Sequence, residues 1–288
     1  MPKTVLVTGA TGTQGGAVAD HLLSGDHGEF AVHALTRHPD STPARELAER
    51  GAEVVQGDLA EKNTIRPIVE EVDAVFGVTN FWEHGYDDEI EHGTNLAEAA
   101  ADVGVEHLVF SSVGGAERDT GIPHFDSKWE IERRIRDLDL PATVVRPVFF
   151  MQNFEAARED IEGGTLANAL AEGVSLQMID ADDIGGFVAE ALADPDRYVG
   201  ESYELASDEH TLESAAETFS DVLGHEVEAV HVPIDEFREQ MGEEYAVMFE
   251  WFNEHGYEAD IEALRTDHDV GFTPLAEYLR ERGWSADD

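Results

Sequence analysis

Short apolar runs alternate with amphipathic stretches through the first half of the chain. The apolar runs are rich in β-branched residues, which is typical of strands buried on both faces. These strands are predicted at Thr4–Thr8, Phe30–Thr36, Glu53–Gln56, Ala74–Val78, His107–Ser112 and Ala142–Pro147. Helices are predicted between them at Gly15–Leu23, Ala44–Glu49, Thr64–Glu70, Asp87–Val103 and Phe125–Leu138. This alternation predicts an α/β fold with a Rossmann-type, doubly wound parallel sheet.

The pattern weakens after Asn153. Helices are predicted at Ala181–Ala193, Thr211–Val222, Ile234–Met241, Tyr245–Trp251 and Leu275–Arg282, and strands at Glu201–Leu205 and Val227–Val232. We expect residues 1–153 to form the Rossmann-type domain. Residues 154–288 are expected to form a smaller α/β lobe, interwoven with the first domain and closing over the carboxyl ends of its strands.

The charge of the chain is far from neutral. It has 63 acidic and 18 basic side chains, a formal net charge of −45. Such a surface repels itself unless salt screens it, and at molar salt the Debye length is ~3 Å. We therefore expect a cytoplasmic protein of a salt-accumulating halophile, with an ordinary acidic protein as the alternative. Few cations are available to neutralise phosphates, so direct nucleic-acid binding and a polybasic membrane patch are not expected.

Two further chemistries are excluded or disfavoured. The chain has no cysteine, which excludes disulfides, zinc thiolates and thiol nucleophiles. His84 and His92 lack a convincing third ligand, so no metal site is predicted. No apolar run approaches the ~20 residues of a membrane-spanning helix, and the first strand begins too early to leave room for a signal peptide.

A glycine-rich motif links the first strand to the first helix. Gly9 permits a tight turn, Gly12 lets the backbone approach a pyrophosphate at the helix N-terminus, and Gly15 allows the helix to pack on the strand. A glycine-rich turn without a ligand is the alternative, but the strand–turn–helix context favours a dinucleotide site. The predicted contacts are Gly9, Thr11, Gly12, Thr13, Gln14 and Gly15.

The end of the second strand indicates which dinucleotide binds. NAD-preferring sites carry an acid there to hold the ribose 2′-hydroxyl. This chain has Thr36-Arg37-His38, and Arg37 can pair with a 2′-phosphate. The prediction is NADP(H), with a surface arginine beside an acidic neighbour as the alternative role of Arg37.

Other strand ends supply further candidate contacts. Asp58 either accepts from the adenine amino group or caps a helix. Thr79 and Asn80 end the fourth strand, where the chain passes the nicotinamide half. Lys62 either contacts phosphate or is solvated, and the stretch Trp82–His84 either caps the nicotinamide pocket or is an ordinary loop.

Together these residues resemble the NmrA-like family of atypical short-chain dehydrogenase/reductases, in particular its redox-sensor group. The motifs that carry the resemblance are Gly9 to Gly15, Thr36-Arg37, Gln56-Gly57-Asp58, Val78-Thr79-Asn80, His124 to Lys128 and Phe150 to Asn153. The resemblance implies a two-lobed fold with NADP in the cleft, lined by Gly9 to Gly15, Arg37, Thr79, Asn80, Lys128 and Asn153. It also implies a sensor or regulator that signals to a partner protein.

Active dehydrogenases of this type use Tyr-x-x-x-Lys, in which the tyrosine hydroxyl protonates the substrate. This chain keeps Lys128 but has His124 in the tyrosine position. Lys128 is expected to anchor the ribose, and both residues stay candidate catalytic groups. The leading interpretation is an NADP(H)-binding sensor. The alternatives are an NADPH-dependent reductase of quinones, enones or carbonyl compounds and, against the missing tyrosine, a sugar-nucleotide epimerase.

Overall fold

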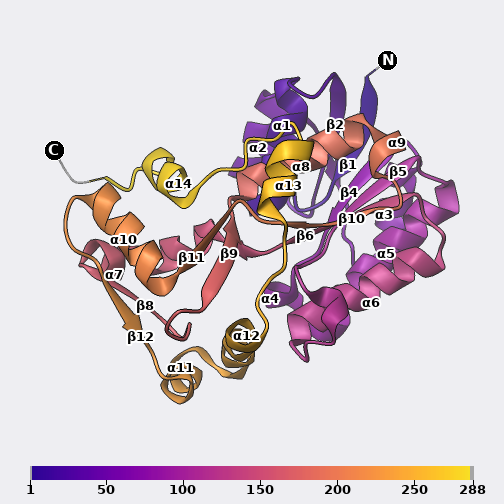
Figure 1. Ribbon diagram of the computed structural model, residues 1–288. Helices are drawn as coiled ribbons and strands as arrows, with labels where there is room; N and C mark the ends of the chain where they lie inside the picture. Colours follow the sequence, from indigo (N-terminus) through magenta and orange to yellow (C-terminus); the bar gives the residue numbers. More distant parts are fainter. Residues whose placement is uncertain (1, 286–288) are drawn as a thin grey trace.

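The computed structural model describes residues 2–285, with a parallel seven-stranded sheet at their centre (Figure 1). Its strands are β1 (Lys3–Val7), β2 (Phe30–Thr36), β3 (Glu53–Gln56), β4 (Ala74–Val78), β5 (His107–Ser111), β6 (Ala142–Pro147) and β10 (Ser202–Leu205). Their order in the sheet is β10-β6-β5-β4-β1-β2-β3, and β1 pairs in parallel with both β2 and β4. The chain thus winds outwards in both directions from β1 and β4, which confirms the predicted Rossmann-type, doubly wound fold.

Helices cover both faces of this sheet. They are α1 (Thr13–Ser24), α2 (Thr42–Glu49), α3 (Lys62–Val69), α5 (Tyr86–Val103), α6 (Pro123–Asp137) and α8 (Ala181–Ala193). Successive strand residues point to opposite faces, so Leu6 packs with α3, α5 and α6, whereas Val5 and Val7 pack with α1, α2 and α8. Because both faces are covered, the inner strands β1 and β4 are nearly continuous apolar runs, whereas the edge strand β3 has exposed polar ends.

The remaining elements lie largely to one side of the central sheet (Figure 1). They include two small sheets of order β11-β9-β7 and β12-β8. The strands are β7 (Phe149–Phe150), β8 (Thr165–Asn168), β9 (Ser175–Ile179), β11 (Asp208–Thr211) and β12 (Glu228–His231). The helices are α4 (Phe81–His84), α7 (Arg158–Glu162), α9 (Pro195–Tyr198), α10 (Leu212–Leu223), α11 (Ile234–Met241), α12 (Glu243–Glu254), α13 (Ile261–Asp267), α14 (Leu275–Glu281), and the 3-10 turns η1 (Ala116–Arg118) and η2 (Met151–Ala157).

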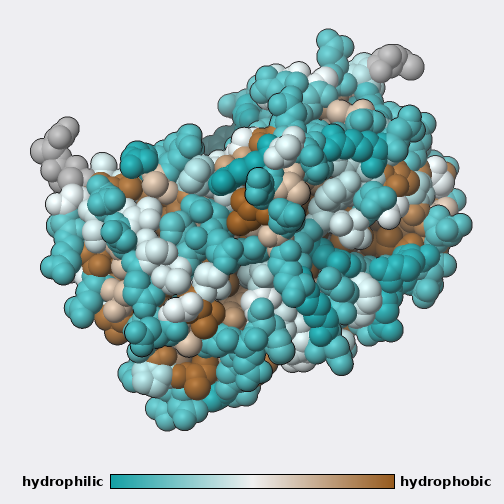
Figure 2. Space-filling model, viewed as in Figure 1, coloured by the Kyte–Doolittle hydropathy of each residue, from teal (hydrophilic) through white to brown (hydrophobic). Residues whose placement is uncertain are grey.

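The surface carries the charge that the composition implies. Hydrophilic residues cover most of the face shown in Figure 2, and hydrophobic residues form separate small areas between them. In the part of the chain that the structure describes, no helix is both long and apolar enough to cross a membrane.

Two elements that follow residue 153 belong to the main layers of the fold. The predicted strand near Glu201–Leu205 is β10, which pairs with β6 at the edge of the central sheet. The predicted helix Ala181–Ala193 is α8, which packs on α1 and on the strands beneath it. The division of the chain at residue 153 stays a prediction.

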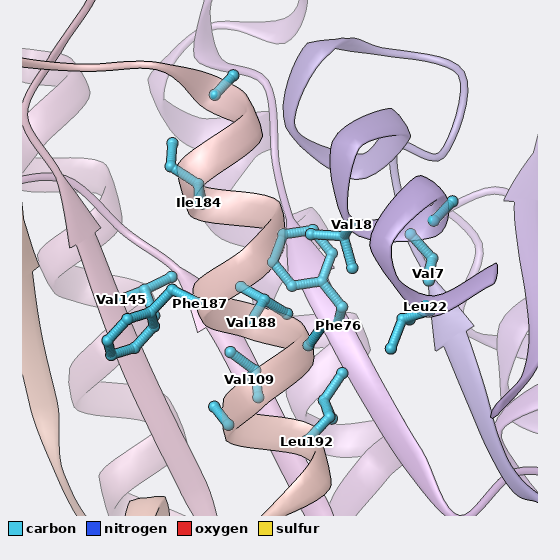
Figure 3. Packing of buried hydrophobic residues seen from close by; sticks show 14 of the residues in the cluster. Val7, Val18, Leu22, Phe76, Val109, Val145, Ile184, Phe187, Val188 and Leu192 are labelled. Atoms are coloured by element: carbon cyan, nitrogen blue, oxygen red, sulfur yellow. The ribbon is translucent and has the colours of Figure 1, made fainter. Parts of the chain in front are cut away.

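Helix α8 packs unusually closely on α1. A Cβ atom added at Gly185 would lie 2.7 Å from the backbone of Ala17, so the two helices touch at their backbones. Figure 3 shows Ile184, Phe187 and Val188 of α8 above the apolar side chains of the sheet. A helix from the second half of the chain therefore fixes the position of α1, whose N-terminus opens onto the candidate site.

Candidate functional site

The candidate site lies where β1 and β4 end, at the reversal of strand order. The buried hydroxyl of Thr8 accepts a hydrogen bond from Val78 N at 2.8 Å and donates one to Val78 O at 3.1 Å. This pair of bonds ties the two strand ends together. In doubly wound sheets the crevice outside this position is where ligands bind.

The glycine-rich loop forms a tight turn at the end of β1. Gly9 has a positive φ of 60°, and its carbonyl accepts from Gly12 N at 2.8 Å. A Cβ atom at Gly15 would lie 2.3 Å from the oxygen of Gly9, so only glycine lets α1 start this close to the strand. The loop residues Thr11, Gly12 and Thr13 are exposed.

Helix α1 begins without a counter-charge or a cap. Gly12 is its N-cap, no side chain caps it, and its first turn holds no acidic residue. The first N–H groups of a helix have no partner within the helix, and its dipole favours an anion there. In a chain with 63 acidic residues, an acid-free helix start at an exposed glycine turn is well suited to a phosphate group.

The next residue of α1 is tied to the neighbouring strand end. Ser111 Oγ, at the end of β5, donates to Gln14 Oε1 at 2.6 Å. The adjacent hydroxyl of Ser112 is buried and has no hydrogen-bond partner. The hydroxyls that end β5 therefore lie beside the start of α1, and one of them is already committed to Gln14.

Arg37 follows β2 and pairs with a residue that is distant in sequence. Its Nη2 atom lies 2.6 Å from Glu83 Oε1 on α4, and both side chains are nearly half exposed. The hydrogen bond to Arg37 keeps the pKa of Glu83 below its usual value. The acidic neighbour that the sequence left open as an alternative partner is thus Glu83, at the mouth of the site.

Two other predicted contacts have local partners. Asp58 Oδ1 accepts from Ala60 N at 3.0 Å, so it closes a turn ahead of α3 rather than capping the helix. Lys62 lies 3.1 Å from both Glu98 and Asp102 on α5, which places it in an ion-pair cluster between the two helices. Lys62 remains partly exposed to solvent in this cluster, and its phosphate contact stays a prediction.

Lys128 forms a buried network at the end of β4. Its Nζ atom donates to Thr79 O at 3.0 Å and to Thr79 Oγ1 at 2.8 Å, and it lies 3.0 Å from Glu89 Oε1. An ammonium group has three hydrogens, and these three acceptors account for all of them. Glu89 is fully buried and also accepts from the hydroxyls of Thr79 and Ser127.

The charge of Glu89 depends on these partners. Burial by itself would raise the pKa of Glu89, but the charge of Lys128 and the hydroxyl hydrogen bonds lower it below its usual value. Sequence reasoning missed Glu89. Its signal was an acid on the buried face of α5, seven residues before Leu96 and eleven before Ala100.

His124 lies one turn before Lys128 on α6, but it faces other elements. Its Nδ1 atom lies 2.7 Å from Glu244 Oε1 on α12. The His124 ring is 5.0 Å from the ring of Trp82, which stacks on Tyr245 at 4.9 Å with an interplanar angle of 19°. His124 on α6 therefore contacts α4 through aromatic rings and α12 through the carboxylate of Glu244. Glu244 and Tyr245 were not identified from the sequence as site residues.

The last predicted contacts are Asn80 and Asn153. Both are exposed, and Asn80 directly precedes α4.

Two hollows of about 370 and 390 Å³ lie away from all these residues. One lies between the ends of α3 and α5, and the other between α5 and α6. Charged side chains line much of both, so we locate the site by its contacts at the strand ends. Among the described residues, no three acidic or histidine side chains come together as a metal site.

A glycine turn from a buried strand into an uncapped helix, at the reversal of a doubly wound sheet, is the arrangement of dinucleotide-binding Rossmann proteins. The sequence pattern of the NmrA-like family matches residues 1–279. The chain therefore belongs to the NmrA-like family.

Known proteins resemble the whole chain. An NmrA-like family domain-containing protein of Dictyostelium discoideum is 31% identical over 309 residues, covering 100% of both chains. The NADP(H) complex of the triphenylmethane reductase of Citrobacter sp. has a TM-score of 0.82 at 22% identity, covering 96% of this chain and 99% of the other. NmrA, a negative transcriptional regulator solved with NADP, has a TM-score of 0.75 at 21% identity, covering 100% and 93%. At these identities the two structures show a shared fold.

Proposed function

We propose that this chain binds NADP(H) at the carboxyl ends of β1, β2 and β4. The exposed turn Gly9–Gly15 and the uncapped start of α1 suit the pyrophosphate. Arg37 suits the 2′-phosphate, because a guanidinium can donate two parallel hydrogen bonds to it. The NADP complexes among the structural relatives support the same cofactor. Asp58, Asn80 and Asn153 stay proposed contacts to the adenosine and nicotinamide halves.

Arg37→Ala tests the cofactor assignment. A charge-assisted contact contributes about 1.5–3 kcal/mol, so the variant should bind NADPH about 10–100 times more weakly and NADH almost unchanged. Calorimetric titration of both dinucleotides measures this. An unchanged preference for NADPH over NADH would remove Arg37 from the assignment.

We further propose that the chain senses the dinucleotide rather than turning it over rapidly. The observation that supports this is the state of Lys128, whose three hydrogens are all committed to Thr79 and Glu89. Loss of a proton from Lys128 would leave the buried carboxylate of Glu89 without its counter-charge, which is costly. Position 124 offers no hydroxyl. Among the described residues, the two candidate acids both have partners, since His124 lies 2.7 Å from Glu244, and this suits a regulator that signals to a protein partner.

A reductase is the second candidate, and one observation favours it. Trp82 is 55% exposed and stacks on Tyr245 near His124, so a flat acceptor has an aromatic surface to lie on. Quinones or enones that take their proton from water need no side-chain acid. A relative with a similar fold is named as a triphenylmethane reductase, which supports the same reading.

NADPH oxidation separates the two candidates. The assay uses the full chain in concentrated KCl with a panel of quinones, enones and aldehydes, and Arg37→Ala as the cofactor-binding control. Turnover that falls in the control in proportion to NADPH affinity would establish a reductase and reject the sensor. Stoichiometric NADPH binding without turnover on any acceptor would support the sensor and direct the search to a protein partner.

We also propose that the acidic surface is an adaptation to a salt-rich cytoplasm. The support is the net charge of −45 and the hydrophilic face of Figure 2. Molar salt would screen the repulsion that such a surface creates.

A further inference from the structure

Helix α4 links two parts of the protein through adjacent side chains. Glu83 reaches back to Arg37 at the end of β2, at 2.6 Å. Trp82 points to the second half of the chain, where it stacks on Tyr245 of α12. Only four residues form α4, from Phe81 to His84. A change at Glu83 therefore acts within one helical turn of the contact that joins α4 to α12.

Glu83 and a 2′-phosphate would both need the guanidinium of Arg37 as a counter-charge. Each is an anion that pairs with the Arg37 guanidinium, and Glu83 already takes its Nη2 donor. His84, the next residue of α4, has its Nε2 atom 3.7 Å from the other oxygen of Glu83, farther than the guanidinium of Arg37. A phosphate held by Arg37 would lie close to the Glu83 carboxylate, because both anions contact the same guanidinium. Two like charges so close together repel each other, even when partly exposed to water.

We propose that Glu83 competes with the 2′-phosphate for Arg37 and so sets how strongly the protein discriminates NADP(H) from NAD(H). When the phosphate takes Arg37, Glu83 is released, and α4 carries this change to the contact between Trp82 and Tyr245. A ligand without the 2′-phosphate leaves both pairs in place. The inference rests on the proposed NADP(H) binding and adds its regulation: α4 signals the presence of the 2′-phosphate to α12.

The exposure of the Arg37–Glu83 pair predicts that this discrimination depends on salt. Both side chains are nearly half exposed, so mobile ions reach them. Salt weakens the repulsion between Glu83 and the phosphate as it weakens the attraction of both for Arg37. Competition between two exposed anions is therefore strongest at the lowest salt in which the chain stays folded.

Glu83→Gln tests the competition, because glutamine keeps the shape of the side chain and removes its charge. The probes are 2′,5′-ADP and 5′-AMP, which differ only by the 2′-phosphate. From the Coulomb energy of a phosphate about 5 Å from a carboxylate in a solvent-like dielectric, the variant should bind 2′,5′-ADP up to about tenfold more tightly at low ionic strength, where the charges are least screened. Binding of 5′-AMP should not change, and the gain should shrink as KCl is raised. Glu71→Gln, an exposed glutamate on the loop after α3, controls for net charge.

An equal gain in both charge variants, or equal or weaker binding of 2′,5′-ADP by Glu83→Gln, would overturn the competition. These results differ from a failure of the proposed function. If the wild-type chain binds neither NADPH nor 2′,5′-ADP, the cofactor assignment itself is wrong. If both bind through Arg37 but Glu83→Gln gains nothing, only the role of Glu83 is wrong.

Fluorescence tests the coupling to α12. The chain has four tryptophans, so the wild type is compared with Trp82→Phe to isolate the emission of Trp82. We expect 2′,5′-ADP to change the emission of the wild type but not of Trp82→Phe, and 5′-AMP to change neither. Equal changes in both proteins, or no change in the wild type at saturating 2′,5′-ADP, would overturn the coupling.

Discussion

The buried pair of Lys128 and Glu89 gives the sharpest test of how this site is built. Lys128→Met removes the ammonium group and keeps much of the length and volume of the side chain. Glu89 then stays in a fully buried position, with hydroxyl hydrogen bonds from Thr79 and Ser127 but no counter-charge. Removing one partner of a buried ion pair typically costs about 3–5 kcal/mol.

This cost corresponds to a measurable change in melting temperature. Unfolding entropy near the midpoint is about 2.1 cal/mol/K per residue, or about 0.6 kcal/mol/K for a chain of this length. The variant should therefore melt about 5–8 °C below the wild type. Lys128→Met combined with Glu89→Gln removes both charges and should recover most of the loss, because no buried charge is left unpaired; the amide oxygen accepts from one of the two hydroxyls, and the amide NH2 donates to the oxygen of the other.

The loss should depend on pH in a defined direction. In the wild type the pKa of Glu89 is lowered, so its contribution is present above the unfolded value of 4.5 and is lost as the pH falls through the lower folded value. Without Lys128, burial dominates and the folded variant favours protonated Glu89. The stability gap between wild type and Lys128→Met should therefore be largest near pH 7–8 and should narrow towards pH 5.

Calorimetry of the wild type, the single variant and the double variant in concentrated KCl between pH 5 and pH 8 measures these differences. A loss below about 1 kcal/mol at pH 7.5 would contradict the buried pair, as would a gap that does not narrow towards pH 5. Lys128 would then face the cleft, and its pairing with Glu89 would no longer count against a catalytic role.

Three other outcomes are expected. Gly15→Ala should lower the free energy of unfolding by about 1–3 kcal/mol in denaturant titration and weaken dinucleotide binding, since its Cβ meets the Gly9 oxygen at 2.3 Å. Gly16→Ala, whose Cβ lies 3.5 Å from its nearest neighbour, is the matched control. A similar loss of stability in Gly16→Ala would refute the packing explanation. Burial raises the pKa of Asp183 to about 7, so wild-type stability should fall as the pH rises from the unfolded value of 3.8 through about 7. Asp183→Asn should flatten that slope in melting curves from pH 5 to 8, and an unchanged slope would assign it to another group. Lowering KCl from 3 M to about 0.1 M lengthens the Debye length from below ~3 Å to ~10 Å. Because the acidic side chains then repel one another over a longer range, the melting temperature should fall steeply. A melting temperature that does not depend on salt would contradict the halophile proposal.

The sequence by itself predicted the first six strands of the central sheet and the glycine turn that follows the first of them. Strands covered on both faces are mostly apolar, so inner strands such as β1 and β4 were visible as continuous runs, for example Thr4–Thr8. The glycines at positions 9 and 15 were equally informative, because a positive φ and a 2.3 Å approach leave no alternative residue. The apolar runs and the glycine positions both reflect local backbone geometry, which residues close together in the sequence determine.

Only the tertiary structure decided which charges meet. Arg37 and Glu83 are 46 positions apart, and His124 and Glu244 are 120 apart, so no local pattern joins them. The same holds for β10 and α8, whose sequences predicted a strand and a helix but not the layer they complete. Glu89 is the clearest case: on the sequence it is one acid among 63, and only the fold buries it against Lys128. Burial and pairing are properties of the assembled layers, since distant segments must first pack before one carboxylate loses its water and gains a partner.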